Sequence, residues 1–378
     1  MINPKEFISC IAKTGINTIT GVPDSLLKDL TAAIDSYWPS EKHIISTNEG
    51  SALALAIGSY MATKKVPMVY LQNSGIGNII NPITSLADTL VYSIPILLII
   101  GWRGEVDHEG QQINDEPQHK KQGIITLKQL ELLDIPYIII EKNTLDYAKK
   151  ITEIFNQCID KNRPVALVIR KGTFKKHQKI NTKGIENLPS RESVINQILN
   201  TFGDNNPIIS TTGFTSRELY ELRKTRNEAH SKDFLTVGGM GHASQIACGI
   251  AKFRGEEKVV CIDGDGGLLM HTGSLAISAE CDNLIHFVIN NGVHDSVGGQ
   301  PTKGNKLKLF KIAKEFGYKN CFRIESLQEL EKNCNYINQS KGSTFIEIMC
   351  KVYTRSNLGR PENKPIENKL EFIKFLNS

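Results

Sequence analysis

The chain has 378 residues, of which 40% are hydrophobic and 22% charged, a globular composition with room for two domains. The longest apolar run, 94–101, is too short to cross a bilayer, and the N-terminus lacks the layout of a signal peptide. We therefore expect a cytoplasmic protein with no membrane partner. The net charge of +5 comes from scattered basic residues, so we expect no nucleic-acid partner either.

Short apolar and β-branched runs alternate with helical patterns along the whole chain. The runs of the first half lie at 16–22, 43–48, 67–73, 95–102, 136–141 and 164–170. Those of the second half lie at 207–212, 233–239, 258–266, 284–291 and 343–350. Strands this apolar, separated by helices, are typical of parallel sheets covered on both faces. The pattern predicts an α/β protein with two tandem doubly wound parallel-sheet domains, whose sites lie at the carboxyl ends of strands.

The stretch between the two halves reads as a connection. Residues 171–190 are polar, basic and without periodicity, which indicates a surface linker. This division places the first domain at 1–170 and the second at 191–378, with no central domain between them.

The eight cysteines include no Cys-x-x-Cys pair, and most stand in apolar or helical surroundings. Such surroundings are typical of buried free thiols. We expect reduced, structural cysteines, with neither a zinc site nor a disulfide framework.

The most specific pattern lies where two strands of the second half end. After the strand that ends at Ile262, the chain turns through 263–267, Asp-Gly-Asp-Gly-Gly, where glycines let the backbone approach a phosphate. A later strand ends on Asn290 and Asn291. A carboxylate from Asp265 and an amide oxygen from Asn291 are hard ligands of the kind that Mg²⁺ prefers, although Mn²⁺ would accept them too.

A second pattern lies in the first half, where Glu49 follows the strand at 43–48 and precedes a helical run. A carboxylate in a first helical turn is often only a favourable capping group. That reading stays open when Glu49 is considered alone.

Together the two patterns resemble the motifs of thiamine-diphosphate enzymes of the pyruvate-decarboxylase type, which carry a strand-end Glu-Gly-x-Ala in their first domain. The resemblance implies the thiamine-diphosphate-binding fold, with thiamine diphosphate and Mg²⁺ as cofactors. It implies that Glu49 bonds to the pyrimidine of the cofactor and activates it. It also implies that Asp265, Asn291 and the main-chain carbonyl of Val293 hold the metal.

Further cofactor contacts follow from the same resemblance. Met240, in the stretch 234–251, resembles the apolar residue that props the cofactor in its bent conformation, although it can equally be a core methionine. The stretch 72–86 resembles the loop that lies against the pyrimidine, although its small residues can equally form an ordinary strand-to-helix turn. The remaining expected contacts are Asn78, Gly239, Gly264, Gly266 and Gly267.

The lack of a central domain is typical of the branch that comprises the phosphonopyruvate and sulfopyruvate decarboxylases. Four stretches resemble this branch, and they lie at 21–27, at 101–105 with 115–123, at 211–223 and at 290–302. Phe214 departs from it, because a lysine is expected after the glycine. His294 and Asp295 stand where the sulfopyruvate enzymes show a tyrosine-glycine pair. The resemblance thus implies decarboxylation of phosphonopyruvate in phosphonate biosynthesis, with sulfopyruvate or another small 2-keto acid as the alternative.

Such a substrate is a small anion, and planar bidentate donors suit a phosphonate. Arg103 and Arg217 are therefore candidate substrate ligands, with surface salt bridges as the alternative, and Ser296 is a further donor. His119 and His294 are candidate proton donors, although a lone histidine is more often structural. The other side chains expected to act in catalysis are Asp24, Ser25 and Asp295.

The partners follow from the resemblance as well. In this superfamily the cofactor binds between domains of two subunits, which implies a homodimer or a larger homo-oligomer. A non-catalytic phosphate-binding regulator and a carboligase are the alternatives from other functional classes. The chain carries Glu49 in addition to the metal motif, which favours an enzyme, because a protein that only binds phosphate does not need this glutamate.

Overall fold

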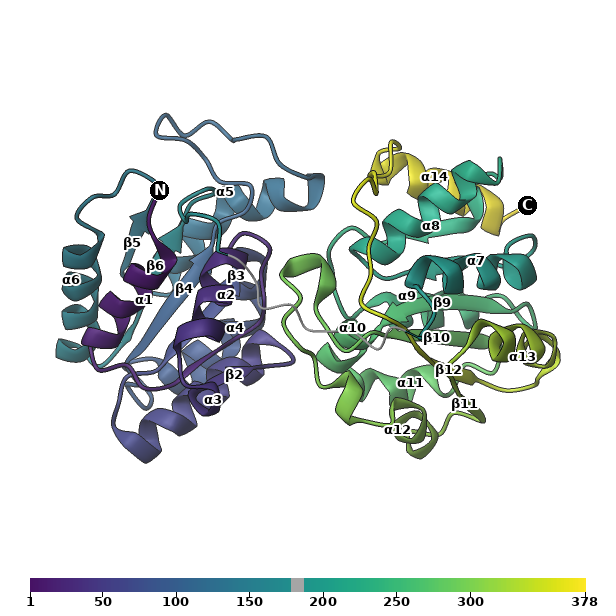
Figure 1. The fold of residues 1–378 in the computed structure, drawn as a ribbon, viewed down its shortest axis with the longest axis horizontal. Helices are drawn as coiled ribbons and strands as arrows, with labels where there is room; N and C mark the ends of the chain where they lie inside the picture. Colours follow the sequence, from purple (N-terminus) through teal and green to yellow (C-terminus); the bar gives the residue numbers. More distant parts are fainter. Residues whose placement is uncertain (178–186) are drawn as a thin grey trace. The chain divides into compact units, whose positions relative to one another are not determined.

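The computed structural model describes residues 1–177 and 187–378, which form two compact units (Figure 1). The first unit comprises 1–177 with 297–300, and the second comprises 187–296 with 301–378. Of the predicted linker, 171–177 pack on the first unit, where Phe174 forms a parallel bridge with Ile2. Residues 178–186 lie outside the described residues, so the predicted boundaries stay a prediction.

The first unit is built on a six-stranded sheet whose strands all pair in parallel, in the order β2-β1-β3-β4-β6-β5. The strands are β1 (Ile19–Gly21), β2 (His43–Ile45), β3 (Met68–Gln72), β4 (Ile96–Gly101), β5 (Tyr137–Ile140) and β6 (Pro164–Ile169). The helices are α1 (Pro4–Lys13), α2 (Lys28–Tyr37), α3 (Glu49–Thr63), α4 (Ile76–Pro82), α5 (Pro117–Leu132) and α6 (Tyr147–Asp160). All six strands lie within the runs that the sequence predicts.

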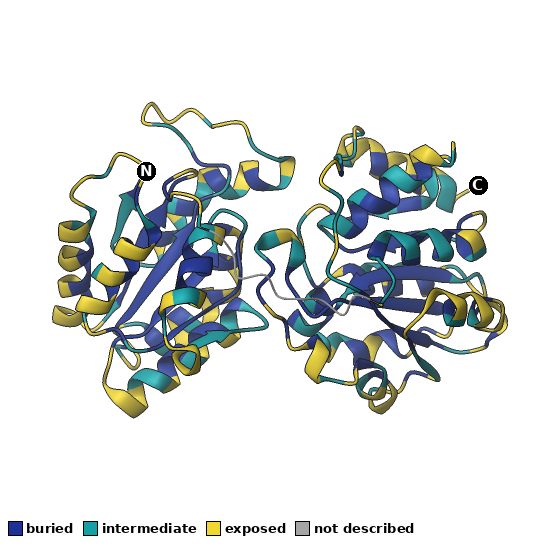
Figure 2. Cartoon of the chain, viewed as in Figure 1, coloured by how far each residue is buried: buried dark blue, intermediate teal, exposed yellow. Residues whose placement is uncertain are grey.

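Helices cover both faces of this sheet because its central strands, such as β4 and β6, are apolar and buried at consecutive positions. In β4, Leu97 and Ile99 pack with α1, α2 and α6, whereas Leu98 and Ile100 pack with α3, α4 and α5. Successive side chains of a strand point to opposite faces, so one continuous apolar run supplies both cores. Figure 2 shows the resulting buried sheet between helices whose outer faces are exposed.

The second unit repeats the architecture with another parallel sheet, in the order β11-β12-β10-β9-β7-β8. Its strands are β7 (Ile208–Ser210), β8 (Asp233–Leu235), β9 (Val259–Gly264), β10 (Leu284–Asn290), β11 (Asn320–Ile324) and β12 (Thr344–Met349). Its helices are α7 (Arg191–Phe202), α8 (Phe214–Thr225), α9 (Ala243–Ala251), α10 (Asp265–Met270), α11 (Leu275–Ser278), α12 (Leu309–Glu315), α13 (Leu327–Gln339) and α14 (Pro365–Leu376). The predicted α/β class, with two doubly wound parallel sheets, is confirmed.

One strand of this sheet, β11, escaped the sequence prediction. It is an edge strand, and four of its five residues are only half-buried, so its sequence NCFRI lacks the apolar run that marks the other strands. In the described part of the chain, no helix has both the length and the apolar character that a bilayer span requires.

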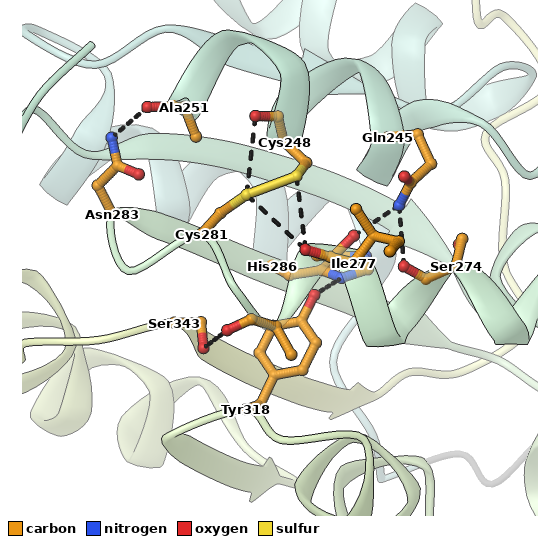
Figure 3. The surroundings of a disulfide bond; sticks show 12 residues. Gln245, Cys248, Ala251, Ser274, Ile277, Cys281, Asn283, His286, Tyr318 and Ser343 are labelled. Atoms are coloured by element: carbon orange, nitrogen blue, oxygen red, sulfur yellow. Dashed lines mark hydrogen bonds between the residues drawn. A yellow bond between two sulfur atoms is a disulfide. The ribbon is translucent and has the colours of Figure 1, made fainter. Parts of the chain in front are cut away.

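The expectation of reduced cysteines was wrong for one pair, since Cys248 and Cys281 form a disulfide (Figure 3). Their Cα atoms lie 6.1 Å apart although 33 positions separate them in the sequence. Cys248 belongs to α9 and Cys281 follows α11, and Gln245 joins the same two helices through its bond to the Ser278 hydroxyl. Tertiary packing, which Cys spacing does not encode, brings the two sulfurs together. The remaining cysteines, at 10, 158, 261, 321, 334 and 350, are free.

Candidate active site

The expected metal ligands of the second unit come from two neighbouring strands. β9 and β10 pair directly, with Gly264 opposite Ile289, so the residues that follow these strands lie at the same edge of the sheet. Asp265 begins α10 directly after β9, and Asn291 follows the end of β10. Both side chains are buried.

Asp265 is a buried carboxylate that forms no ion pair with a basic side chain among the described residues. Thr302 donates a hydrogen bond from its hydroxyl to Oδ2 of Asp265. Burial nevertheless raises the pKa of Asp265 to about 7, against the lowering effect of this bond and of nearby main-chain N–H groups. A cation at this carboxylate would offset the cost of its burial, so the residue fits a metal ligand.

The paired asparagines have different surroundings. The amide of Asn290 donates to Glu347 Oε1 (2.8 Å) and to the carbonyl of Gly304 (3.1 Å), which ties β10 to β12. Asn291 instead accepts a bond from the main-chain N–H of Val293 (3.1 Å) within its own turn. Asn290 is therefore a structural residue, and Asn291 is the one that remains at the edge of the site.

The oxygen set of Asp265, Asn291 and the Val293 carbonyl is of the hard type that suits Mg²⁺. No group of three or more His, Cys, Asp or Glu side chains among the described residues is arranged to hold a metal ion. A metal site here thus depends on one carboxylate supplemented by amide and carbonyl oxygens.

The glycines of the 263–267 turn differ in the space around them: two have close neighbours, and one faces open space. A methyl group on Gly266 would lie 3.0 Å from the ring of His294, and one on Gly267 would lie 2.7 Å from Asp263 Oδ1. At Gly264 a methyl group would meet no atom within 4 Å. The turn therefore needs its glycines for packing and leaves room for a ligand beside its first one.

The loop that carries Gly239 and Met240 lies against the same turn. A methyl group on Gly241 would come within 3.1 Å of the Gly267 carbonyl, so the two loops touch. Gly239 has a positive φ of 56°, and Met240 is half-buried. The structure thus brings the predicted cofactor residues of the second unit together.

The segment after Asn291 carries three more predicted residues. His294 is buried beside Gly266, and burial lowers its pKa to about 4. Asp295 accepts bonds from Arg191 Nη1 (3.3 Å) and from the Thr354 hydroxyl (2.8 Å). The hydroxyl of Ser296 lies 3.1 Å from the position of a methyl group on Gly213.

Arg191, which the sequence did not single out, anchors this segment. Its guanidinium makes a bidentate pair with the buried carboxylate of Glu218 (2.7 and 2.8 Å). The ring of Phe214 lies 5.3 Å from the guanidinium carbons of both Arg191 and Arg217. The departure from the expected lysine thus places an aromatic ring beside two arginines.

Arg217 itself binds main chain. Its Nε donates to the carbonyl of Gly359 (2.5 Å), and its Nη2 donates to that of Leu358. These bonds hold the C-terminal segment on α8. Its predicted role as a substrate ligand stays a prediction, and it would depend on the guanidinium N–H groups that remain.

In the first unit, Glu49 is positioned by the start of a helix. Asn48 caps α3 by accepting a bond from Ser51 N (2.8 Å), which makes Glu49 the first helical residue. Glu49 is buried, and the amide of Asn78 donates to its Oε2 (2.7 Å). A methyl group on Gly75 would lie 2.5 Å from its Oε1. The segment after β3 therefore encloses the carboxylate.

A second group lies at the ends of β1 and β4 in the same unit. We name it the Arg103 cluster, and it consists of Asp24, Ser25, Arg103, Asp115 and His119. Arg103 makes a bidentate ion pair with Asp115 through Nε (2.8 Å) and Nη2 (2.6 Å), and its Nη1 donates to the Ser25 hydroxyl (2.9 Å). The sequence analysis named four of these residues but missed Asp115.

Burial shifts two pKa values in the Arg103 cluster. It raises the pKa of Asp24 to about 6, although Arg103 and main-chain N–H groups oppose the change. It lowers the pKa of His119 to about 4, and the charge of Arg103 adds to that effect. At neutral pH His119 is therefore an uncharged imidazole, while Asp24 titrates close to the physiological range.

Two family models match the chain, one in each unit. "Thiamine pyrophosphate enzyme, N-terminal TPP binding domain" matches residues 5–130, and "Thiamine pyrophosphate enzyme, C-terminal TPP binding domain" matches residues 210–348. The phosphonopyruvate decarboxylase of Streptomyces viridochromogenes is 30% identical, over 100% of this chain and 95% of its own length. That of Streptomyces hygroscopicus is also 30% identical, over 99% and 94%.

The chain belongs to the phosphonopyruvate decarboxylase family of thiamine-diphosphate enzymes. It is a keto acid decarboxylase with thiamine diphosphate as its cofactor, and Mg²⁺ is the usual metal of this family. The sulfopyruvate decarboxylase of Methanosarcina acetivorans is 26% identical over 93% of this chain and 92% of its own length. The names of these relatives therefore give two substrates, phosphonopyruvate and sulfopyruvate.

Proposed function

We propose that this decarboxylase converts phosphonopyruvate to phosphonoacetaldehyde and CO₂ in phosphonate biosynthesis. The observation that carries the proposal is the 30% identity to two phosphonopyruvate decarboxylases along essentially the entire chain. His294 and Asp295, in place of a tyrosine-glycine pair, support the same substrate. Sulfopyruvate is the second candidate, because the match to a sulfopyruvate decarboxylase also runs over most of the chain.

In this proposal the second unit holds the metal and the diphosphate. Asp265, Asn291 and the Val293 carbonyl would bind Mg²⁺, which neutralises the buried carboxylate of Asp265. The open space at Gly264 and the touching loops support this assignment. The residues that would lie against the cofactor are Gly239, Met240, Gly264, Gly266 and Gly267.

The first unit would hold and activate the pyrimidine. Glu49 would exchange a proton with the ring, and Asn78 would keep its carboxylate in place through the 2.7 Å bond to Oε2. Thiamine diphosphate, when bound, accepts the electron pair that is released as CO₂ leaves. The task left to the chain is to position the keto acid and to supply a proton to the product.

The candidate substrate residues divide by their hydrogen-bonding capacity. Arg103 and Arg217 can only donate, which suits an anionic group, and Ser25 and Ser296 add hydroxyl donors. His119 and His294 are neutral at pH 7, so each donates from one ring nitrogen and accepts at the other. Asp24 and Asp295 complete the proposed catalytic set.

The partner in this proposal is a second copy of the chain, which gives a homodimer or a larger homo-oligomer. Light scattering coupled to gel filtration measures the mass directly. A monomer with full activity would contradict this part of the proposal.

The substrate proposal is tested by measuring CO₂ and aldehyde release from phosphonopyruvate, sulfopyruvate and pyruvate, with and without thiamine diphosphate and Mg²⁺. Cofactor-dependent turnover that prefers phosphonopyruvate is the expected result. A preference for sulfopyruvate would keep the chemistry and replace the substrate. Replacing Mg²⁺ by Mn²⁺ in the same assay tests which metal supports turnover.

A further inference from the structure

Asp115 is the most firmly held carboxylate of the Arg103 cluster. Besides the two bonds from Arg103, it accepts bonds from the main-chain N–H groups of Gly104 (2.9 Å) and Glu116 (2.8 Å). Four donors thus surround one carboxylate. Its partial burial raises its pKa, but the bonds from Arg103 and Gly104 and the charge of Arg103 outweigh this effect and hold the pKa at about 2. Asp115 is therefore an anion whose position the loop between β4 and α5 fixes.

The ion pair in turn fixes the guanidinium of Arg103. Nε and Nη2 both point at Asp115, so the plane of the group is set by the carboxylate. Bonds to Asp115 and Ser25 account for three of the five guanidinium N–H groups within the described residues. One N–H group on Nη1 and one on Nη2 remain for another acceptor.

The hydrogen bond to Ser25 has only one direction. Arginine has no acceptor, so the Ser25 oxygen must accept from Nη1 over 2.9 Å. The hydroxyl hydrogen of Ser25 is then free to be donated elsewhere. A serine held in this way can donate its hydroxyl hydrogen to another group while it accepts the bond from Arg103.

We propose that Asp115 is a positioning residue, which holds Arg103 so that Arg103 orients the Ser25 hydroxyl as a donor to an oxygen of the bound keto acid. A keto acid offers carboxylate and keto oxygens, all of them acceptors. This inference rests on the proposed function only in so far as the substrate is a 2-keto acid, and it does not depend on the phosphonate. Asp115 acts through Arg103 and need not touch the substrate.

The test is a double-mutant cycle with Ser25→Ala, Asp115→Asn and the double variant, measured on the keto acid that the wild type decarboxylates best. Asparagine has the shape of aspartate but only one acceptor oxygen, whereas the donors around Asp115 use both carboxylate oxygens. We expect S25A to lower kcat/KM roughly 10–100-fold, as for a lost bond to a charged group. D115N should lower it about 10-fold in the wild-type background and less than about 2-fold in the S25A background.

Asp107→Asn is the matched control. Asp107 lies in the same loop, is half-buried like Asp115, and accepts bonds from the N–H groups of Glu109 (2.9 Å) and Gln111 (2.8 Å). D107N should leave kcat/KM unchanged. Melting temperatures and the Kd of thiamine diphosphate, measured on every variant, separate loss of fold from loss of positioning.

Two results would overturn the inference. Equal effects of D115N with and without Ser25 would mean that Asp115 does not act through this hydroxyl. A D115N protein with reduced melting temperature but unchanged kcat/KM would make Asp115 purely structural. The wild-type substrate comparison decides the proposed function separately, because the cycle can be run on any 2-keto acid that is turned over.

Discussion

The side-chain amide of Asn78 donates a hydrogen bond to Oε2 of Glu49 over 2.7 Å, and it joins two segments 29 positions apart. Glu49 is also the first residue of α3, so the helix fixes its main chain while Asn78 holds its carboxylate. Such fixation is what a group needs when it transfers a proton at one defined atom.

We expect Glu49→Gln to lower kcat at least about 100-fold, because glutamine cannot exchange a proton with the cofactor. The Kd of thiamine diphosphate should change little, since glutamine has nearly the same shape. Isothermal titration measures the Kd, and CO₂ release measures kcat. Near-normal turnover would remove Glu49 from the mechanism.

Gly75→Ala tests the placement of Glu49 without changing its chemistry. The new methyl group would lie 2.5 Å from Oε1 of Glu49, which must shift to make room. We expect a loss of activity approaching that of E49Q, with the fold retained because the backbone at Gly75 has an ordinary φ of −75°.

Gly58→Ala is the control for that substitution. Gly58 is exposed in α3, outside the stretch 72–86, and a methyl group there meets nothing within 4 Å. Full activity and a gain of up to about 1 kcal/mol in the free energy of unfolding are expected, since alanine favours a helix. Equal activity of the G75A and G58A variants would show that the position of the Glu49 carboxylate does not matter.

The difference between local and long-range information explains what the sequence could predict. Glu49, Asp265 and Asn291 each stand at a strand end that the apolar runs already mark, so their places in the fold could be predicted. The bond from Thr302 to Asp265 joins residues 37 positions apart and leaves no local pattern. The same holds for the bonds of Asn290 to Glu347, which the paired asparagines do not reveal.

Long-range contacts also decide what the predicted arginines do. The sequence marks Arg103 and Arg217 as equivalent candidates for an anionic substrate. In the structure, Arg103 pairs with Asp115 beyond the carboxyl end of β4, while Arg217 binds main-chain carbonyls about 140 positions away. Their different partners could not be predicted, because nothing near either arginine in the sequence specifies them.

Asp24→Asn should change the pH dependence of stability. Burial raises the folded-state pKa of Asp24 from the usual 3.8 to about 6. Between these two values the unfolded chain has already lost the proton that the folded chain keeps, so stability falls as the pH rises. The penalty is absent below the lower value and complete above the higher one.

Asparagine carries no such penalty at any pH. The free energy of unfolding of the variant, relative to wild type, should therefore rise by about 2 kcal/mol from about pH 4.5 to about pH 8. Denaturant unfolding of both proteins without cofactor at the two pH values measures this difference. A difference that is constant with pH would show that the Asp24 carboxyl is not perturbed by burial.

Arg191→Met should destabilise the second unit, because it removes the partner of a buried charge. Glu218 is buried, and each of its carboxylate oxygens accepts a bond from Arg191, which also pairs with Asp295. Leaving such a carboxylate without its partner typically costs about 3–5 kcal/mol in the free energy of unfolding.

Two further variants separate this cause from a general loss of packing. Arg323 pairs with Glu325 at the surface, so Arg323→Met should cost less than about 1 kcal/mol. The double variant R191M/E218Q removes both charges of the buried pair, and we expect it to recover part of the loss. If adding E218Q to R191M lowers the free energy of unfolding by as much as an ordinary core substitution does, the unpaired Glu218 charge is not the cause of the instability of R191M.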